Sequence, residues 1–201
     1  KSNMSNVPYL SILGQALYIA ITTRPDLATS VSACGKYSRN PGRQHWLALL
    51  RILSYLNHTK EISLVLGGKT NSIYLQAYSD SDWAGDLDLR RSRTGYLVFL
   101  NEAPIIWSSK LQSSTALSST EAEYYAVSEV AKEVLFAKHL LEATGVHIPY
   151  PIPIKCDNIG AIYLSNNHTT SQRTKHIDTR RHFVREFVED GILKIVFVGT
   201  K

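Results

Sequence analysis

Apolar side chains recur at helical spacing through the first third of the chain. This pattern predicts helices over Tyr9–Ile21, from Pro25 to about Tyr37, and over about Gln44–Leu56. Pro25 suits a first helical position, and the Pro-Gly pair at 41–42 breaks the chain before the third helix. That helix is expected to turn its apolar residues toward a core: Trp46, Leu49, Leu50, Leu53 and Leu56. Residues 1–61 are therefore predicted to form a helical segment.

From Ile62 onward the pattern changes to that of strands. Strands are predicted over Ile62–Leu66 and Ile73–Ser79, joined by a Gly/Asn turn, and a hairpin is predicted around Asn101-Glu102 from Thr94–Leu100 and Ala103–Ser108. Further elements are predicted downstream: a long helix over Ser118–Ala143, a strand over Ile152–Cys156, helices over Asn158–Ser165 and Thr174–Glu189, and a strand over Ile192–Val198. This order predicts an α/β domain with a mixed sheet flanked by helices.

Composition and charge narrow the class of protein only slightly. The net charge of +5 and the pI of about 9.2 favour a polyanionic partner without naming one. No apolar run approaches the ~18 residues of a membrane span, so none is expected. Cys34 and Cys156 lie in different segments without metal-ligand spacing, and we expect buried thiols in a reducing compartment.

Three acidic residues follow or open predicted elements. Asp80 ends a strand, Glu123 lies near the start of the long helix, and Asp157 follows another strand. Carboxylates that converge from separate elements repel one another unless a cation lies between them. Their arrangement indicates a divalent metal site.

The helix start contains two overlapping capping patterns, so Glu123 could be merely a capping residue. These patterns are Ser118-x-x-Glu121 and Thr120-x-x-Glu123. Helical geometry separates the two acids, because Glu123 is in line with the apolar stripe and Glu121 is in line with polar residues. We therefore expect Glu121 to cap the helix in solvent and Glu123 to point at the sheet, where a carboxylate needs a partner or a metal.

The other two acids have structural alternatives of their own. Asp80 and Asp82 lie on the same face of the strand, so alternation does not separate them, and either can be an acid that starts a loop. Asp157 and Asn158 can cap the helix that follows. Capping and metal binding are compatible, because different lone pairs of one side chain serve each role.

Two segments are rich in cations. Residues 169–186 carry several Arg, Lys and His residues against two acids, and Arg90-Arg91-Ser92-Arg93 lies in a predicted loop. Either segment can contact a phosphate backbone or form a solvated surface, and the sequence leaves both interpretations open. His176 and His182 are six residues apart, which is not the spacing of a zinc helix.

Longer motifs connect the chain to a known family. They are Tyr78-Ser-Asp-Ser-Asp-Trp-Ala-Gly-Asp86, Arg91-Ser-Arg-Thr-Gly-Tyr96, Trp107-Ser-Ser-Lys-Leu-Gln112, Ala116-Leu-Ser-Ser-Thr-Glu-Ala-Glu-Tyr124, Cys156-Asp-Asn158 and Arg173-Thr-Lys-His-Ile-Asp178. On these motifs residues 62–201 resemble the ribonuclease H domain of copia-type LTR retrotransposon polyproteins. Thr23-Arg-Pro-Asp-Leu27 and His45-Trp46 resemble the segment that follows the polymerase palm in the same polyproteins.

The resemblance implies a fold and an activity. The fold is a ribonuclease H-like five-stranded mixed sheet flanked by helices, preceded by a thumb- or connection-like segment over residues 1–61. The activity is hydrolysis of the RNA strand of RNA–DNA hybrids with two Mg²⁺ ions, for which Mn²⁺ can substitute, as part of a reverse transcriptase. Asp80, Glu123 and Asp157 match the family's acids and are expected to be the catalytic metal ligands.

The resemblance implies two partners, the RNA–DNA hybrid and the upstream polymerase domain, and no membrane. It implies an intracellular location, either a cytoplasmic retrotransposon particle or the nucleus. Substrate contacts are expected from Ser108, Ser109, Lys110, Gln112, Asn158 and Arg173.

One acid of the family pattern is not found. Ribonucleases H use a fourth carboxylate beyond the last strand, and in this family it resembles an Ala-Asp pair after a Val-x-Thr segment. Because Val198-Gly-Thr-Lys201 ends the sequence, we expect that acid beyond Lys201. The alternative to an active enzyme is a catalytically inactive nucleic-acid-binding remnant of the same fold. For residues 1–61, a further possibility is that the helical segment is only a spacer between polymerase and nuclease.

Overall fold

The computed structural model describes residues 4, 6–67, 73–166 and 175–199. The chain divides into two compact units, one of Lys1–Val65 with Trp107–Lys110 and one of Leu66–Ile106 with Leu111–Lys201. Each unit has its own cluster of buried apolar side chains. The assignment of residues 1–61 to a polymerase-derived segment stays a prediction.

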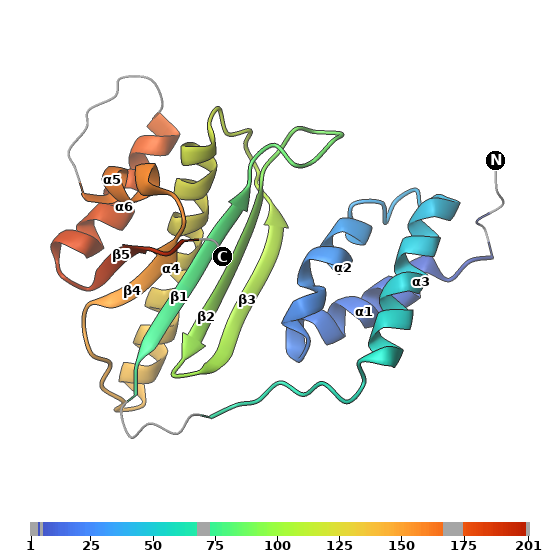
Figure 1. Cartoon of the computed structure of the whole chain (residues 1–201), viewed down its shortest axis with the longest axis horizontal. Helices are drawn as coiled ribbons and strands as arrows, with labels where there is room; N and C mark the ends of the chain where they lie inside the picture. The colour runs from blue at the N-terminus through green and yellow to red at the C-terminus, as the bar shows by residue number, and fades with distance from the viewer. Residues whose placement is uncertain (1–3, 5, 68–72, 167–174, 200–201) are drawn as a thin grey trace. The chain divides into compact units, whose positions relative to one another are not determined.

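The first unit is helical, as the sequence predicts (Figure 1). It contains α1 (Tyr9–Thr22), the 3₁₀ turn η1 (Pro25–Leu27), α2 (Ala28–Gly35) and α3 (Arg43–His58). The Tyr9 hydroxyl donates a hydrogen bond of 2.8 Å to the carbonyl oxygen of Cys34, which joins α1 to the end of α2 inside the unit. The core consists of Tyr9, Leu13, Ala16, Ala20, Leu27, Val31, Cys34, Leu49 and Ile52.

The buried stripe of α3 differs from the predicted one at two positions. Leu50 is 38% exposed, whereas Ile52, which was not predicted to be buried, is 6% exposed. The stripe runs through Leu49, Ile52 and Leu56, because α1 and α2 both pack against that side. Apolar spacing alone could not choose between overlapping stripes on a helix rich in leucine.

The second unit is built on a five-stranded mixed sheet in the order β3-β2-β1-β4-β5. The strands are β1 (Leu75–Asp82), β2 (Arg93–Leu100), β3 (Ala103–Leu111), β4 (Ile152–Cys156) and β5 (Leu193–Phe197). Strand β1 pairs antiparallel with β2 and parallel with β4, and β4 pairs parallel with β5. The predicted hairpin is confirmed, and Asn101 occupies its turn with a left-handed φ of 56°, which asparagine tolerates.

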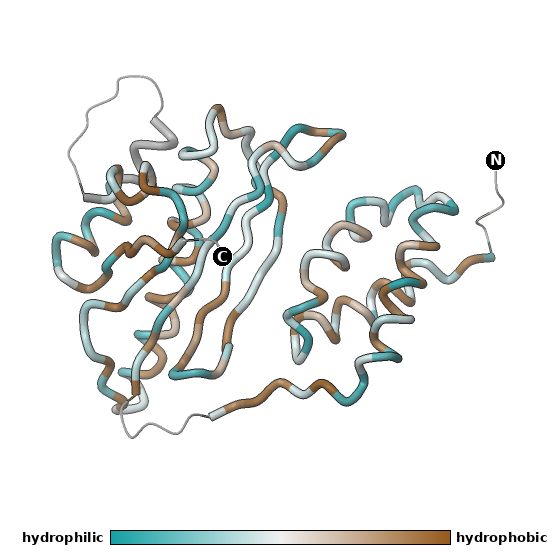
Figure 2. Tube along the Cα trace, in the orientation of Figure 1, coloured by the Kyte–Doolittle hydropathy of each residue, from teal (hydrophilic) through white to brown (hydrophobic). Residues whose placement is uncertain are grey.

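The strand predicted over Ile62–Leu66 is wrong. These residues form no strand, and Figure 2 shows them as an apolar segment between α3 and the uncertain residues before β1. Strand β1 already has β2 on one side and β4 on the other. No hydrogen-bonding edge of β1 remains for a preceding strand, so apolar composition without a partner leaves the segment extended and unpaired.

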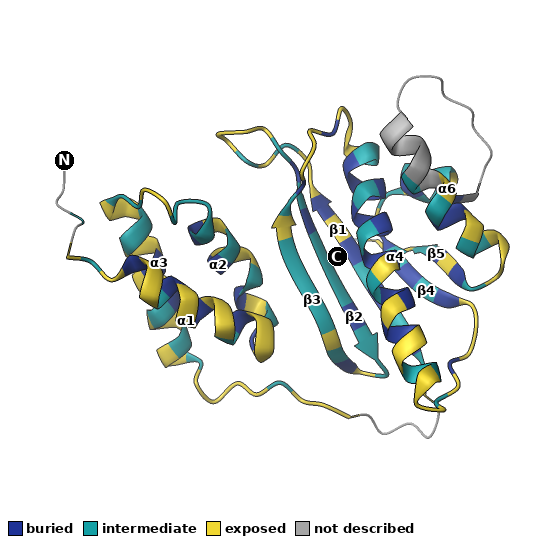
Figure 3. Ribbon diagram, turned by 180° about the vertical axis from the view of Figure 1, so that it is seen from behind, coloured by how far each residue is buried: buried dark blue, intermediate teal, exposed yellow. Residues whose placement is uncertain are grey.

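Three helices cover one face of the sheet: α4 (Ser119–Ala143), α5 (Ile159–Asn166) and α6 (Lys175–Glu189). Figure 3 shows α4 buried on the side that faces the strands and exposed on the other. Its valines 127, 130 and 134 pack with Leu75, Ala77 and Ile154 of the sheet, and all three valines are fully buried. None of the described helices is both long and apolar enough to cross a membrane.

Strand β4, between β1 and β5, offers a direct test of this core. Ile154 is fully buried, so replacing it with alanine removes apolar contacts and leaves a cavity. We expect Ile154→Ala to lower the free energy of unfolding by about 2–5 kcal/mol in chemical denaturation. Ile159→Ala is the matched control, because Ile159 is 69% exposed, and a loss as large as that of Ile154→Ala would contradict the assigned core.

Candidate metal centre

Three elements of the second unit bring their acids to one place. Asp80 belongs to β1, Glu123 to the start of α4, and Asp157 follows β4 directly. Because β1 and β4 are parallel neighbours, their carboxyl ends lie at the same edge of the sheet. One carboxylate oxygen from each of the three residues lies within 4.8 Å of the other two. The acids that the sequence singled out are therefore adjacent in space.

Glu123 points into the protein, as its helical position predicts. Its side chain is only 5% exposed, and the backbone N–H of Ser81 donates a hydrogen bond of 3.1 Å to its Oε1. Its other oxygen, Oε2, is buried without a hydrogen-bond partner in the part of the chain that the structure describes. An ionised oxygen in this position is costly unless a cation or proton satisfies it.

Glu121 takes the capping role. Its backbone N–H donates to the Ser118 hydroxyl at 3.1 Å, and its Oε2 accepts a hydrogen bond of 2.8 Å from the N–H of Leu117. The predicted division of labour between Glu121 and Glu123 is thus confirmed. The helical start is fixed by Glu121, which leaves the Glu123 carboxyl group available for other chemistry.

The electrostatics of the cluster favour a bound cation. Burial, followed by the charges of Asp80 and Asp157, raises the pKa of Glu123 from 4.5 to about 7. Burial and the charge of Asp157 also raise the pKa of Asp80. Both shifts express the cost of holding several negative charges together, and a divalent ion would reverse that cost.

Asp82 ends β1, but its carboxyl group is not one of the three that converge. Its carboxyl group lies directly over Gly85, where an added Cβ atom would fall 1.9 Å from Asp82 Oδ2. Asp80 and Asp82 share a strand face, so alternation could not distinguish them. In the folded chain the Asp82 carboxyl group lies against Gly85, whereas the Asp80 carboxyl group joins those of Glu123 and Asp157.

Asp157 is positioned by the start of α5. The Oδ1 atom of Asn158 accepts a hydrogen bond of 2.9 Å from the N–H of Ala161, so Asn158 and not Asp157 caps the helix. The backbone of Gly160 lies against Thr120 at the start of α4, because an added Cβ would fall 2.9 Å from the Thr120 side chain. This contact holds the starts of α4 and α5 together and so places Asp157 beside Glu123.

Gln112 holds the acidic end of β1 against α4. Its side chain is 2% exposed, and its Nε2 lies 3.3 Å from Ser81 Oγ, 3.0 Å from Thr94 Oγ1 and 3.0 Å from the carbonyl oxygen of Ala122. Its amide is inside the protein and bonded to these three groups, so the predicted contact of Gln112 with a substrate stays a prediction. The amide connects β2, the residue after Asp80 and the residue before Glu123.

The remaining predicted contacts are not gathered at the acids. Ser108, Ser109 and Lys110 lie on β3, which β2 separates from β1. Asn158 adjoins Asp157, and its amide nitrogen is not used in the cap, so its predicted role stays a prediction. Arg173 lies outside the described residues.

The basic helix uses at least two of its cations within the protein. The Arg180 guanidinium lies 3.5 Å from the centre of the Tyr125 ring on α4, and Arg185 is only 8% exposed. His182 is exposed. The part of this segment before Lys175 is not described. Whether the segment contacts phosphates stays a prediction.

Sequence reasoning missed three features that position the acids: the Ser81 N–H, the Gln112 amide and the close approach at Gly160. The first is a backbone N–H group, which does not depend on the type of residue at position 81, so the sequence could not indicate it. The other two belong to motifs already quoted, but only the folded chain shows what they touch.

Removing the Gln112 amide should loosen the cluster. Gln112→Ala leaves buried oxygens of Ser81 and Thr94 without their donor, and we expect the free energy of unfolding to fall by about 1–3 kcal/mol. Chemical denaturation measures the loss. Gln44→Ala, at an exposed position of α3, is the control and should change stability little. Equal effects of the two variants would refute the positioning role.

The raised pKa of Glu123 predicts how stability depends on pH when a chelator removes divalent ions. Between pH 4.5 and about 7 the folded state keeps a proton that the unfolded state releases, so a rising pH favours unfolding. We expect a loss of at most about 3.5 kcal/mol across this window, at about 1.4 kcal/mol per pH unit. Denaturation series at several pH values test this. In the Glu123→Gln variant the free energy of unfolding should depend less on pH in this window. A dependence as steep as that of the unchanged protein would contradict the assignment to Glu123.

Comparisons with known proteins agree with this architecture. No protein-family model matches the chain. The retrovirus-related Pol polyprotein from transposon TNT 1-94 of Nicotiana tabacum is 44% identical over 200 residues, which is 100% of this chain and 15% of that polyprotein. The chain therefore spans less than a sixth of the length of this relative.

Solved structures show the fold. The foamy viral protease-reverse transcriptase in complex with RNA/DNA hybrid is 18% identical, with a TM-score of 0.52 over 96% of this chain and 25% of that chain. LC11-RNase H1, isolated from compost by a metagenomic approach, is 13% identical, with a TM-score of 0.46 over 63% of this chain and 84% of that chain. The predicted five-stranded ribonuclease H-like fold is confirmed. The chain belongs to the retrovirus-related Pol polyproteins of copia-type plant transposons, of which it forms a ribonuclease H-like part.

Proposed function

We propose that this part of the polyprotein hydrolyses the RNA strand of RNA–DNA hybrids at the Asp80–Glu123–Asp157 cluster. The observation that carries the proposal is the convergence of three carboxylates within 4.8 Å around a buried, unpartnered oxygen of Glu123. Support for the substrate comes from the foamy viral enzyme, which has the same fold and was solved with an RNA/DNA hybrid. Membership of a Pol polyprotein family supports a place beside a reverse transcriptase.

The residues fit divalent metal ions. They offer only hard oxygen ligands, which Mg²⁺ prefers and Mn²⁺ accepts. Two such ions, when bound, supply an activated water and stabilise the leaving oxygen of a phosphodiester. Asp80, Glu123 and Asp157 would hold them. The Ser81 N–H fixes one oxygen of Glu123, so its Oε2 is the oxygen directed to an ion.

The protein's own groups also prepare the site for a phosphate. The Asn158 amide nitrogen lies beside Asp157 and can donate to the substrate while its oxygen caps α5. Selection of RNA over DNA requires contacts to 2′-hydroxyl groups and to the shape of the hybrid groove. Ser109, Lys110 and Arg173 are proposed for such contacts, with Lys110 exposed and able to reach a backbone phosphate.

The proposal is tested by cleavage of a hybrid with labelled RNA. We expect Mg²⁺-dependent products that a chelator abolishes. Glu123→Gln removes a metal-binding charge that is worth several kcal/mol to the transition state, so the rate should fall about a thousandfold. Hybrid affinity should stay near that of the unchanged protein, because the Glu123 side chain is only 5% exposed and offers little surface to a nucleic acid.

Glu121→Gln is the matched control. It makes the same change two residues away, at a capping position that glutamine also serves. Its cleavage rate should be that of the unchanged protein. Wild-type cleavage by Glu123→Gln would end the assignment. Binding of the hybrid without Mg²⁺-dependent cleavage would instead support the inactive remnant.

A further inference from the structure

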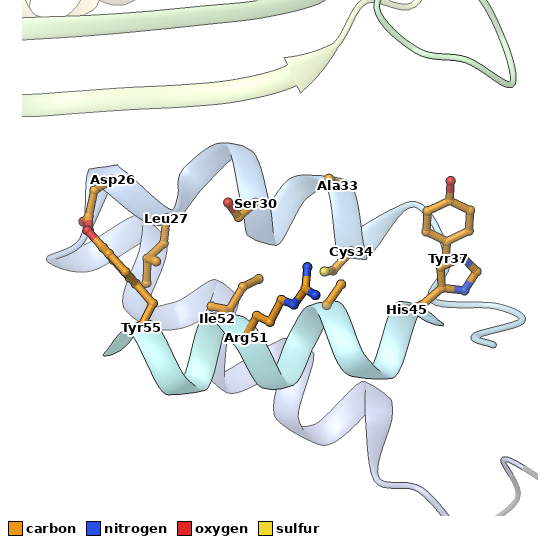
Figure 4. Close-up of a pocket in the computed structure, with 11 residues that line it drawn as sticks. Asp26, Leu27, Ser30, Ala33, Cys34, Tyr37, His45, Arg51, Ile52 and Tyr55 are labelled. Atoms are coloured by element: carbon orange, nitrogen blue, oxygen red, sulfur yellow. The ribbon is translucent and has the colours of Figure 1, made fainter. Parts of the chain in front are cut away.

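A groove between α2 and α3 lies inside the helical unit, apart from the acidic cluster. Its volume is about 580 Å³, which is within the range of small-molecule sites. Small side chains occupy the facing positions, namely Ser30, Ala33 and Cys34 on α2 and Ala48 on α3. Figure 4 shows Ser30, Ala33 and Cys34 on the side of α2 that faces α3. The groove exists because these side chains are too short to fill the gap between the helices.

At one end of the groove, polar and charged side chains bond to one another. Arg24 donates two hydrogen bonds to Asp26, at 3.0 and 2.7 Å, and its guanidinium also lies over the Tyr55 ring. Hydrogen bonds from Arg24 and Tyr55 lower the pKa of Asp26. The Asp26 carboxylate is therefore ionised and already bonded to Arg24, and its negative charge repels an anion at this end of the groove.

A stacked aromatic pair lines the other end of the groove. The rings of Tyr37 and His45 are 3.7 Å apart and nearly parallel, at 10°. The N–H of Gly42 donates to His45 Nδ1 at 2.8 Å, which fixes the ring at the start of α3. A flat aromatic ligand can continue this stack or pack between Leu27, Ile52 and the small residues.

Arg51 supplies a cation between these two ends. Its guanidinium lies in the groove in Figure 4, and it has no hydrogen bond or ion pair within the part of the chain that the structure describes. The surrounding charge is also positive. Residues 1–65 contain seven Lys and Arg residues against two acids, a net charge of +5. The whole chain also has +5, so the remaining residues are balanced and the positive surplus lies in the helical unit.

We propose that this groove binds a nucleoside monophosphate, with the phosphate at Arg51 and the base among the apolar and aromatic walls. The aromatic end and the apolar walls suit a base, and the unpaired guanidinium suits a phosphate. The volume of about 580 Å³ suits a single nucleotide. The site does not depend on the hydrolysis proposed for the acidic cluster.

Calorimetric titration of the full chain with adenosine 5′-monophosphate tests the site. A chelator is present throughout, so that metal ions at the acidic cluster cannot contribute. We expect saturable binding, at least about tenfold weaker binding of adenosine and of ribose 5-phosphate, and slower alkylation of Cys34 by iodoacetamide. Cys34 lines the groove, whereas Cys156 is fully buried in the other unit and should react equally with and without the nucleotide.

Three variants localise the binding. Arg51→Gln should weaken it about tenfold or more. Arg39→Gln, the same change at an exposed residue that does not line the groove, should leave it unchanged. Ala48→Phe fills the groove from an exposed helical position and should abolish binding, with an unchanged thermal unfolding midpoint showing that it folds.

Several outcomes overturn the proposal. They are the absence of saturable binding, equal losses in the two arginine variants, and unchanged binding in a folded Ala48→Phe variant. Hexa-adenylate binding that is tighter than that of the mononucleotide and depends equally on Arg39 and Arg51 would also overturn it, in favour of a strand on a basic surface.

Discussion

The repulsion among three carboxylates is the constraint on which the second unit depends. Glu123 is almost fully buried, yet it lies beside Asp80 and Asp157. A fold selected for stability alone would place an apolar side chain there. The surrounding structure holds the acids together against this cost. Burial and the neighbouring negative charges raise the pKa of Glu123 for the same reason. A bound cation would relieve this repulsion, which supports the proposed chemistry on a phosphate.

The fold resists this repulsion through short contacts among the elements that carry the acids. The Ser81 N–H holds Glu123, the Gln112 amide joins β1 and β2 to α4, and Gly160 brings α5 against the start of α4. Each contact uses a backbone group or a buried polar atom, so the geometry does not depend on flexible surface side chains. Such rigid positioning suits a catalytic site, because metal ligands must be held close to their productive geometry.

The two units differ in their electrostatics. The helical unit carries the chain's positive surplus and an apolar groove with an unpaired Arg51, whereas the sheet unit is balanced and concentrates its acids at one edge. The chain thus offers two anion-related sites of opposite character. As we propose, one binds phosphate through metal ions held by the acids, and the other binds phosphate directly through a guanidinium. Neither site needs the other for its chemistry.

The sequence by itself determined much of this protein. Periodicity located most of the helices and strands, and the helical position of Glu123 relative to Glu121 correctly assigned one acid to the interior and the other to the cap. It failed where strand pairing depends on tertiary structure, as at Ile62–Leu66. This segment is apolar, but β1, the strand that follows it, already has neighbours on both sides. Which of Asp80 and Asp82 joins the cluster, why Gln112 is buried, and where a groove opens between α2 and α3 were decided only by tertiary structure. These depend on distances between residues far apart in the chain, and local pattern contains no such distances.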